Sequence, residues 1–352
     1  MKVYPKLILE ALEKVRYPGT GKDIVALGMV NDDIRIDGNS VSFSISFDKQ
    51  NDPFIKSVIK AAEAAIITYV DKDIDIKGRI TAVARPKVQP VAAEILPGVK
   101  HIIAVASGKG GVGKSTIAAN LAVAFAVKGY SVGLLDADIY GPSQPKMFCM
   151  EDVRPLSVNV DGRDLIEPVE NYGVKLLSIG FFIEKESAVL WRGPMAGNAF
   201  KQLTEETDWG ELDFLLIDLP PGTSDIHLTM AQTLKLAGAI IVTTPQAVAL
   251  ADARKGYSMF VNDKINVPVL GLVENMAWFT PAELPENKYY IFGKDGGKFL
   301  AEQLGVPLLG QIPIVESIRE SGDSGMPVAL EPDSVTGAAF HFLAQRIAER
   351  LA

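Results

Sequence analysis

The chain has 352 residues, of which 48% are hydrophobic and 22% charged, a composition typical of a soluble globular protein with room for two domains. Its 43 acidic and 35 basic residues give a net charge of −8, which argues against a general nucleic-acid binder because such proteins concentrate positive charge. The single cysteine, Cys149, excludes an intrachain disulfide, and no apolar run approaches the length that crosses a bilayer. The first residues mix charges at helical spacing and lack the apolar block of a signal peptide, so we expect a cytoplasmic protein.

Residues 1–85 predict a small α+β domain. Apolar residues at helical spacing predict one helix at residues 8–15 and a second near Phe54–Tyr69. Short β patterns predict three strands, at Ile24–Val30, Val41–Phe47 and Asp75–Ala84. The predicted order of elements is therefore α-β-β-α-β.

Residues 86–99 predict a linker. The stretch from Arg85 to Val99 contains three prolines and little periodicity, and proline restricts both itself and the preceding residue to extended forms. The linker therefore separates the small domain from a second domain at residues 100–352.

The second domain alternates predicted strands with predicted helices, which specifies a mostly parallel, doubly wound sheet with helices on both faces. The predicted strands are Ile102–Ala106, Val132–Asp136, Val174–Ile179, Phe214–Asp218, Ala239–Thr243, Val269–Glu274 and Pro307–Gly310. The predicted helices are Ser115–Lys128, Pro194–Glu206, Asp225–Lys235, Ala247–Asn262, Gly296–Leu304 and Ser334–Leu351. Ligands of such sheets bind at the carboxyl ends of the strands.

A complete phosphate-binding loop, Gly-Lys-Gly-Gly-Val-Gly-Lys-Ser, joins the first of these strands to the first helix. Its glycines let backbone N–H groups surround phosphate oxygens, and the helix N-terminus adds the positive end of its dipole. Lys114 neutralises the β- and γ-phosphates, and Ser115 offers its hydroxyl to Mg²⁺. The pattern predicts a P-loop NTPase fold and a nucleoside triphosphate bound by Gly108, Lys109, Gly110, Gly111, Val112, Gly113, Lys114, Ser115 and Thr116.

Three carboxylates follow at predicted strand ends. Asp136 and Asp138 begin the sequence Asp-Ala-Asp-Ile-Tyr-Gly-Pro-Ser, where two carboxylates beside a P-loop can hold Mg²⁺ through water and position an attacking water. Asp218 ends an apolar strand, the Walker-B arrangement, and is expected to hold an Mg²⁺-bound water. An acid at the end of a buried strand is rarely structural, because an unpaired buried charge is costly.

Lys109 is a second lysine on a loop that already contains Lys114. Two lysines on one loop repel each other unless a second polyanion is near. Dimerisation solves this problem if each Lys109 reaches the partner's phosphates and stabilises charge there in the transition state.

The motifs together resemble the Mrp-type ATPases. KGGVGKST, DADIYGPS and the stretch from Trp209 to Asp225 carry the resemblance, together with Trp191 to Met195, and it extends from about Ile102 to the C-terminus. These ATPases belong to the deviant-Walker-A group with MinD, ParA and the nitrogenase iron protein. The small first domain resembles the iron–sulfur-assembly-type domain often fused ahead of Mrp ATPases, through Asp23 to Gly28.

The resemblance implies an Mg-dependent ATPase that acts as a homodimer in the carriage or assembly of iron–sulfur clusters, with iron–sulfur apoproteins as clients. It implies that Lys109 acts across the dimer, that Asp138 serves hydrolysis and that Asn275 contacts the adenine. The catalytic set implied is thus Lys109, Lys114 and Asp138, and the Mg²⁺ set is Ser115, Asp138 and Asp218.

The chain departs from the family at its cluster ligands. The family holds a cluster through a Cys-x-x-Cys pair, shared between two subunits, whereas the matching segment Ala277–Pro285 has no cysteine. The first domain has none at Lys49–Pro53 either, and the three histidines form no metal-ligand spacing. No iron–sulfur ligand is identified in the sequence.

Several functions therefore stay open. One is an ATP-dependent cluster carrier, and another is a nucleotide-switched protein that binds a client without its own cluster. A MinD-like membrane switch needs a basic amphipathic tail, and the last helix has only Arg346 and Arg350 as fixed positive charges. A ParA-like DNA switch is disfavoured by the acidic balance. We expect protein clients and no nucleic-acid or membrane partner.

Overall fold

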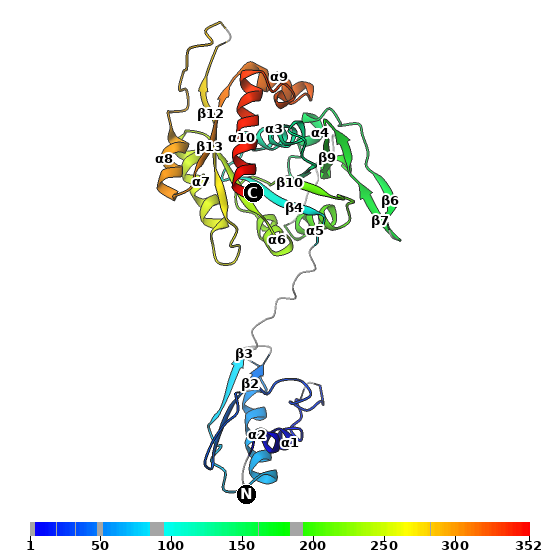
Figure 1. Cartoon of the computed structure of the whole chain (residues 1–352), viewed down its shortest axis with the longest axis vertical. Coiled ribbons are helices and arrows are strands. Elements are labelled where there is room, and N and C mark those ends of the chain that lie inside the picture. Colours follow the sequence, from blue (N-terminus) through cyan, green and yellow to red (C-terminus); the bar gives the residue numbers. More distant parts are fainter. Residues whose placement is uncertain are drawn as a thin grey trace. The chain divides into compact units, whose positions relative to one another are not determined.

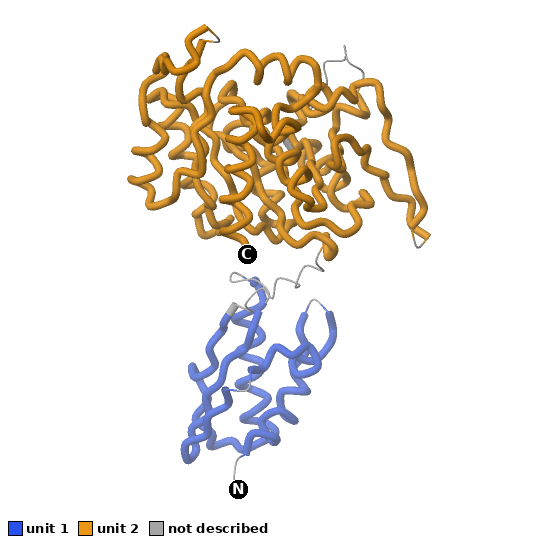
Figure 2. Tube along the Cα trace, turned by 45° about the horizontal axis from the view of Figure 1, so that its top comes forward, with its two compact units in different colours: residues 1–91 blue, residues 92–352 orange. Residues whose placement is uncertain are grey.

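The computed structural model describes residues 4–18, 20–31, 33–47, 52–84, 95–160, 162–183, 193–281 and 283–352. The chain divides into two compact units, residues 1–91 and 92–352, each with its own hydrophobic core (Figure 2). The division falls within the proline-containing stretch, and most of the predicted linker, up to residue 94, lies outside the described residues. Among the helices that are described, none is both long enough and apolar enough to span a membrane.

The first unit packs two helices against a three-stranded sheet of order β1-β2-β3 (Figure 1). Strand β2 pairs antiparallel with β1 and parallel with β3. The alternating apolar residues of β2, from Val41 to Phe47, are buried in the core of this unit, and Ser44 and Ser46 between them are buried as well. Its elements are α1 (Pro5–Leu12), β1 (Arg35–Asp37), β2 (Ser40–Phe47), α2 (Ile55–Tyr69) and β3 (Ile80–Ala84).

The predicted strand at Ile24–Val30 is wrong. This segment forms turns, and only Val30 pairs, in an isolated bridge with Ile45. The Asp23 carboxylate accepts a hydrogen bond from the N–H of Ala26 at 2.7 Å, so the backbone turns around this side chain instead of extending. The first strand of the unit is β1, at Arg35–Asp37.

The second unit is built on an eight-stranded sheet of order β13-β12-β11-β4-β10-β5-β9-β8. All neighbours in it are parallel except β8, which runs antiparallel to β9. The chain crosses from β4 through α3 towards β5 in one direction and from β11 through α7 to β12 in the other. Right-handed connections therefore place α3 and α7 on opposite faces of the sheet (Figure 1). This confirms the predicted doubly wound architecture.

The strands of this sheet are β4 (Val99–Ser107), β5 (Val132–Asp136), β8 (Val169–Asn171), β9 (Val174–Ser178), β10 (Leu212–Asp218), β11 (Gly238–Thr243), β12 (Val269–Phe279) and β13 (Leu308–Ile314). The helices are α3 (Lys114–Val127), α4 (Gln144–Met147), α5 (Gly193–Glu205), α6 (Asp225–Thr233), α7 (Ala247–Phe260), α8 (Gly296–Leu304), α9 (Glu316–Ser324) and α10 (Val335–Leu351), with two 3₁₀ turns, η1 (Ile179–Phe181) and η2 (Val328–Leu330).

Helix α3 is buried on nearly every side. Its residues from Ile117 to Phe125 are all buried, because the sheet covers one side of the helix and α10 and η2 cover another. The last helix, α10, therefore packs against the core, as expected for a helix with so few basic residues. This burial anchors the phosphate-binding loop, which leads directly into α3.

Several elements were not predicted. An antiparallel hairpin, β6 (Leu156–Val160) and β7 (Arg163–Glu167), forms a separate two-stranded sheet, and α4, β8 and α9 are also additional. Strand β12 continues five residues beyond the predicted end, to Phe279, where it still pairs with β13 at Ile314. The motif residues Trp191 and Arg192 lie outside the described residues.

Candidate nucleotide-binding site

The phosphate-binding loop lies between β4 and α3 at the carboxyl edge of the sheet. Gly111 and Gly113 have φ angles of +81° and +80°, a left-handed conformation that favours glycine, and Gly113 precedes the first residue of α3. At Gly108 a Cβ atom would lie 2.0 Å from the carbonyl oxygen of Asp252 in α7. The loop therefore requires glycine at these positions for its turn and for close contact with α7.

The loop borders an open cavity of about 250 Å³. Eight of the nine predicted loop residues line it, whereas Gly108 lies at the contact with α7. The residues that line the cavity are Ser107, Lys109, Gly110, Gly111, Val112, Gly113, Lys114, Ser115, Thr116, Asp138, Ser143, Met147 and Pro221. The first turn of α3 lies at this cavity, so its N-terminal N–H groups are placed where phosphate binding requires them.

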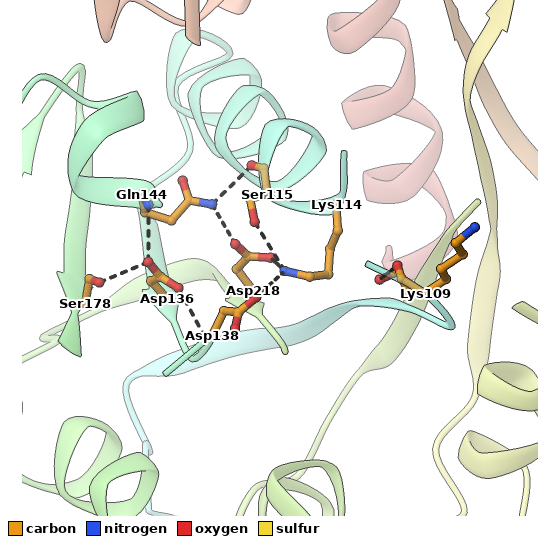
Figure 3. A network of polar contacts seen from close by, with 9 residues as sticks. Lys109, Lys114, Ser115, Asp136, Asp138, Gln144, Ser178 and Asp218 are labelled. Atoms are coloured by element: carbon orange, nitrogen blue, oxygen red, sulfur yellow. Dashed lines mark hydrogen bonds and ion pairs between the residues drawn. The ribbon is translucent and has the colours of Figure 1, made fainter. Parts of the chain in front are cut away.

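Lys114 brings the predicted metal and catalytic residues together. Its ammonium is buried and forms an ion pair with the Asp218 carboxylate. The same ammonium lies 3.9 Å from an oxygen of Asp138 and donates to the Ser115 hydroxyl at 3.3 Å (Figure 3). Each of the three residues predicted to hold Mg²⁺ thus presents an oxygen to one positive group.

These oxygens fit a divalent cation, because hydroxyl and carboxylate oxygens are the ligands that Mg²⁺ prefers, and the Lys114 ammonium marks the place where they converge. The described residues form no cluster of three or more His, Cys, Asp or Glu side chains that could hold a metal ion by themselves. A magnesium ion at this position would therefore depend on Ser115, Asp218 and phosphate oxygens together.

Asp136 braces the turn that carries Asp138. Its fully buried carboxylate accepts hydrogen bonds from the Ser178 hydroxyl at 2.9 Å and from the backbone N–H groups of Asp138 and Gln144, both at 3.2 Å. Burial, with the nearby Asp218 charge, raises the pKa of Asp136 to about 7. Through these contacts Asp136 stabilises the conformation of the turn, whereas Asp138 lines the cavity.

The carboxyl group of Asp138 is partly desolvated. Burial raises its pKa above the ordinary value, Lys114 opposes this effect, and the Asp218 charge adds to it. Its side chain keeps 13% of its surface exposed, so it remains open to water from the cavity. This is the environment expected of a carboxylate that positions a water molecule.

Lys109 and Asn275 take different positions. Lys109 is exposed, and its side chain extends away from the acidic residues, as Figure 3 shows. Asn275 in β12 is buried, and its amide donates to the carbonyl oxygen of Val112 at 2.8 Å. In this structure Asn275 therefore stabilises the phosphate-binding loop through its hydrogen bond to Val112. Its contact with adenine stays a prediction.

The loop after Asp218 ends in a reciprocal cap at the start of α6. The backbone N–H of Ser224 donates to Nδ1 of His227 at 3.1 Å, and the N–H of His227 donates to the carbonyl of Ser224 at 3.1 Å. Nδ1 of His227 also lies 3.1 Å from the Ser224 hydroxyl and 3.2 Å from the Ser224 carbonyl oxygen, whereas Nε2 is buried and has no hydrogen-bond partner among the described residues. Burial lowers the pKa of His227 to about 4, and the positive charge of Lys114 also lowers it.

Sequence analysis missed Gln144. Its side chain is fully buried and donates to the Ser115 carbonyl at 3.1 Å and to the Asp218 carboxylate at 2.8 Å (Figure 3). The only signal in the sequence is its place directly after the DADIYGPS motif.

Comparison with known proteins places both units. The model of the ParA family, described as NUBPL iron-transfer P-loop NTPase, matches residues 98–348, and a model described as iron–sulfur cluster assembly protein matches residues 6–78. The chain is 41% identical to an iron–sulfur cluster carrier protein of Synechocystis sp., over 98% of this chain and 97% of that protein. It is 52% identical to an iron–sulfur cluster carrier protein of Aquifex aeolicus, over 72% of this chain and 69% of that protein.

Among solved structures, a nucleotide-binding protein of Archaeoglobus fulgidus in complex with ADP is similar, with a TM-score of 0.59 and 38% identity. The match covers 68% of this chain and 93% of that chain.

Proposed function

Since the chain belongs to the ParA family of NUBPL iron-transfer P-loop NTPases, we propose that it binds and hydrolyses ATP with Mg²⁺, as a homodimer, in the carriage or assembly of iron–sulfur clusters. One observation carries the ATPase part of this proposal. The buried Lys114 ammonium, at the edge of an open cavity, contacts or approaches Ser115, Asp138 and Asp218. This arrangement supports phosphate binding beside a metal site.

Each residue has a distinct task in the proposed reaction. The loop amides and Lys114 bind the β- and γ-phosphates, and Asp138 orients the attacking water from the exposed side of its carboxylate. Ser115, Asp138 and Asp218 would hold Mg²⁺, directly or through water, and the bound ion would neutralise charge on the phosphates. Lys109, exposed and directed away from its own acidic residues, is available to a second subunit, where it would stabilise charge in the transition state.

The cluster would be cargo rather than a resident cofactor. The relatives in Synechocystis and Aquifex are named iron–sulfur cluster carrier proteins. This chain has one cysteine, Cys149, so a homodimer offers at most two thiolates, and four-thiolate ligation needs cysteines from a client. We therefore propose that the protein delivers or assembles clusters together with a client apoprotein.

The cysteine count also favours a second candidate, an ATPase whose nucleotide state controls the binding of a client while no cluster is held. Anaerobic reconstitution with iron and sulfide separates the two functions. The carrier proposal expects weak or no cluster on the isolated protein and a stoichiometric cluster when a client apoprotein is added. Absence of any cluster with the client present would favour the switch, and a stoichiometric cluster that survives Cys149→Ser would contradict the ligation argument.

A further inference from the structure

Gln144 is the one described residue that contacts Ser115, Asp136 and Asp218 at once. Its backbone N–H donates to Asp136 at 3.2 Å, which fixes the start of α4 against the end of β5. Its side-chain amide then reaches across to the end of β10 and the start of α3 (Figure 3). The residue therefore connects the three elements that carry the acidic residues and the loop.

The orientation of the Gln144 amide is determined by its neighbours. The Ser115 carbonyl and the Asp218 carboxylate, which is paired with Lys114, accept hydrogen bonds, so the group between them is the NH₂, and its two hydrogens serve both acceptors. A hydrogen bond to a charged acceptor in a buried place is among the stronger ones.

Asp218 has two side-chain partners among the described residues, Lys114 and Gln144. They use different oxygens: Lys114 contacts Oδ1 and Gln144 donates to Oδ2. When Lys114 turns to the phosphates of a nucleotide, Gln144 is the partner that remains on the carboxylate. Its hydrogen bond then keeps Oδ1 directed at the place that Lys114 has left.

We propose that Gln144 is a positioning residue that holds the Asp218 carboxylate in the orientation that the metal requires; this rests on the ATPase function proposed above. The requirement is specific to the metal-bound state, because in the nucleotide-free protein Lys114 also holds Asp218. Loss of the amide should therefore weaken the response to Mg²⁺ much more than the response to nucleotide alone.

The test uses Gln144→Met in the full-length protein, which keeps the length of the side chain and removes its donor. The shift in thermal unfolding temperature is measured with ADP alone and with ADP at increasing MgCl₂. We expect the Mg²⁺ concentration at half-maximal shift to rise by about 10- to 100-fold, the usual effect of losing a hydrogen bond to a charged group. The shift with ADP alone should change much less than the response to Mg²⁺.

Gln144→Asn is a second variant, whose shorter amide cannot reach both acceptors and which should change the Mg²⁺ response in the same direction. The matched control is Asn120→Leu, which removes another buried amide, one that donates to the Thr116 carbonyl and accepts from the N–H of Ala329. This control should lower the unfolding temperature without changing the Mg²⁺ response.

An unchanged Mg²⁺ response in both Gln144 variants overturns the positioning role and leaves the ATPase proposal intact. An equal change in Asn120→Leu overturns it as well, since the effect would then be one of general stability. If the wild-type protein responds to neither ADP nor Mg²⁺, the ATPase proposal itself is wrong, and the inference about Gln144 is wrong with it.

Discussion

Lys114 and Asp138 have charged groups only 3.9 Å apart, and yet their substitution should have different effects. Lys114→Ala removes the cation expected at the phosphates and should weaken ATP binding by about 10- to 100-fold. Asp138→Ala should leave binding largely intact and lower kcat by about 10²-fold or more, because the carboxylate is expected to position water. Isothermal titration and steady-state hydrolysis measure the two effects separately. Wild-type turnover in Asp138→Ala would show that another group positions the water.

His227 should make the stability of the second unit depend on pH. Its folded pKa of about 4 lies below the ordinary value of 6.5, so the unfolded state binds the proton more tightly. The stabilising contribution is complete above pH 6.5 and is lost as the pH falls from 6.5 towards 4, by about 3 kcal/mol in total. Denaturant unfolding across this range measures it.

His227→Gln supplies the control for this prediction, since its amide does not titrate. Its unfolding free energy should be lower than that of the wild type at pH 7 and should fall less between pH 6.5 and 4. Parallel curves for the two proteins would mean that another group causes the acid sensitivity.

The parts of the site that follow from local sequence were predictable, because a P-loop and a strand that ends in aspartate are patterns of neighbouring residues. Lys114, Ser115, Asp138 and Asp218 lie together in the structure, and their roles stay predictions. Gln144 could not be predicted, since its role depends on α4 lying beside two strands that are distant in sequence.

At the level of elements, the contact between the P-loop and α7 makes Gly108 sensitive to substitution. Gly108→Ala would place a Cβ 2.0 Å from a backbone oxygen of Asp252, so the loop or the helix must shift. We expect a loss of about 1–3 kcal/mol of unfolding free energy and weaker nucleotide binding. Gly110→Ala is the matched control in the same loop, because its Cβ would meet only Pro221, at 3.9 Å. If the two variants have equal unfolding free energies in urea, the contact between Gly108 and Asp252 can accommodate a Cβ atom without cost.

The strands that were predicted correctly in the second unit are mainly buried ones. Strands β4, β5, β10 and β11 are apolar runs covered on both faces by helices, so their composition alone distinguishes them. The segment Ile24–Val30 is also apolar, and a single side chain, Asp23, turns it. The hairpin β6–β7 was missed because none of its residues is buried, so it carries no pattern of buried apolar positions.

At the level of the whole molecule, the exposed Lys109 predicts that activity depends on association. If Lys109 acts across a dimer, specific activity should rise with protein concentration, and Lys109→Ala should lower kcat by about 10²-fold while ATP binding changes little. Lys128→Ala, an exposed lysine at the C-terminal end of α3, controls for the loss of one positive charge. A monomer in sedimentation with ATP and Mg²⁺, at constant specific activity on dilution, would refute the dimer.

The burial of α3 and β4 on both sides of the P-loop also determines how the amide hydrogens of this unit exchange with deuterium. Amides in elements as buried as α3 exchange mainly when the unit unfolds as a whole, and a ligand that binds only the folded state makes that event rarer. At a nucleotide concentration about 100 times Kd, exchange in α3 and β4 should slow by about 100-fold. Exposed segments such as α9, which has no buried residue, should open locally and exchange at the same rate with and without nucleotide. Occupancy of the loop would thus be recorded along the whole length of α3, including the end that lies away from the ligand.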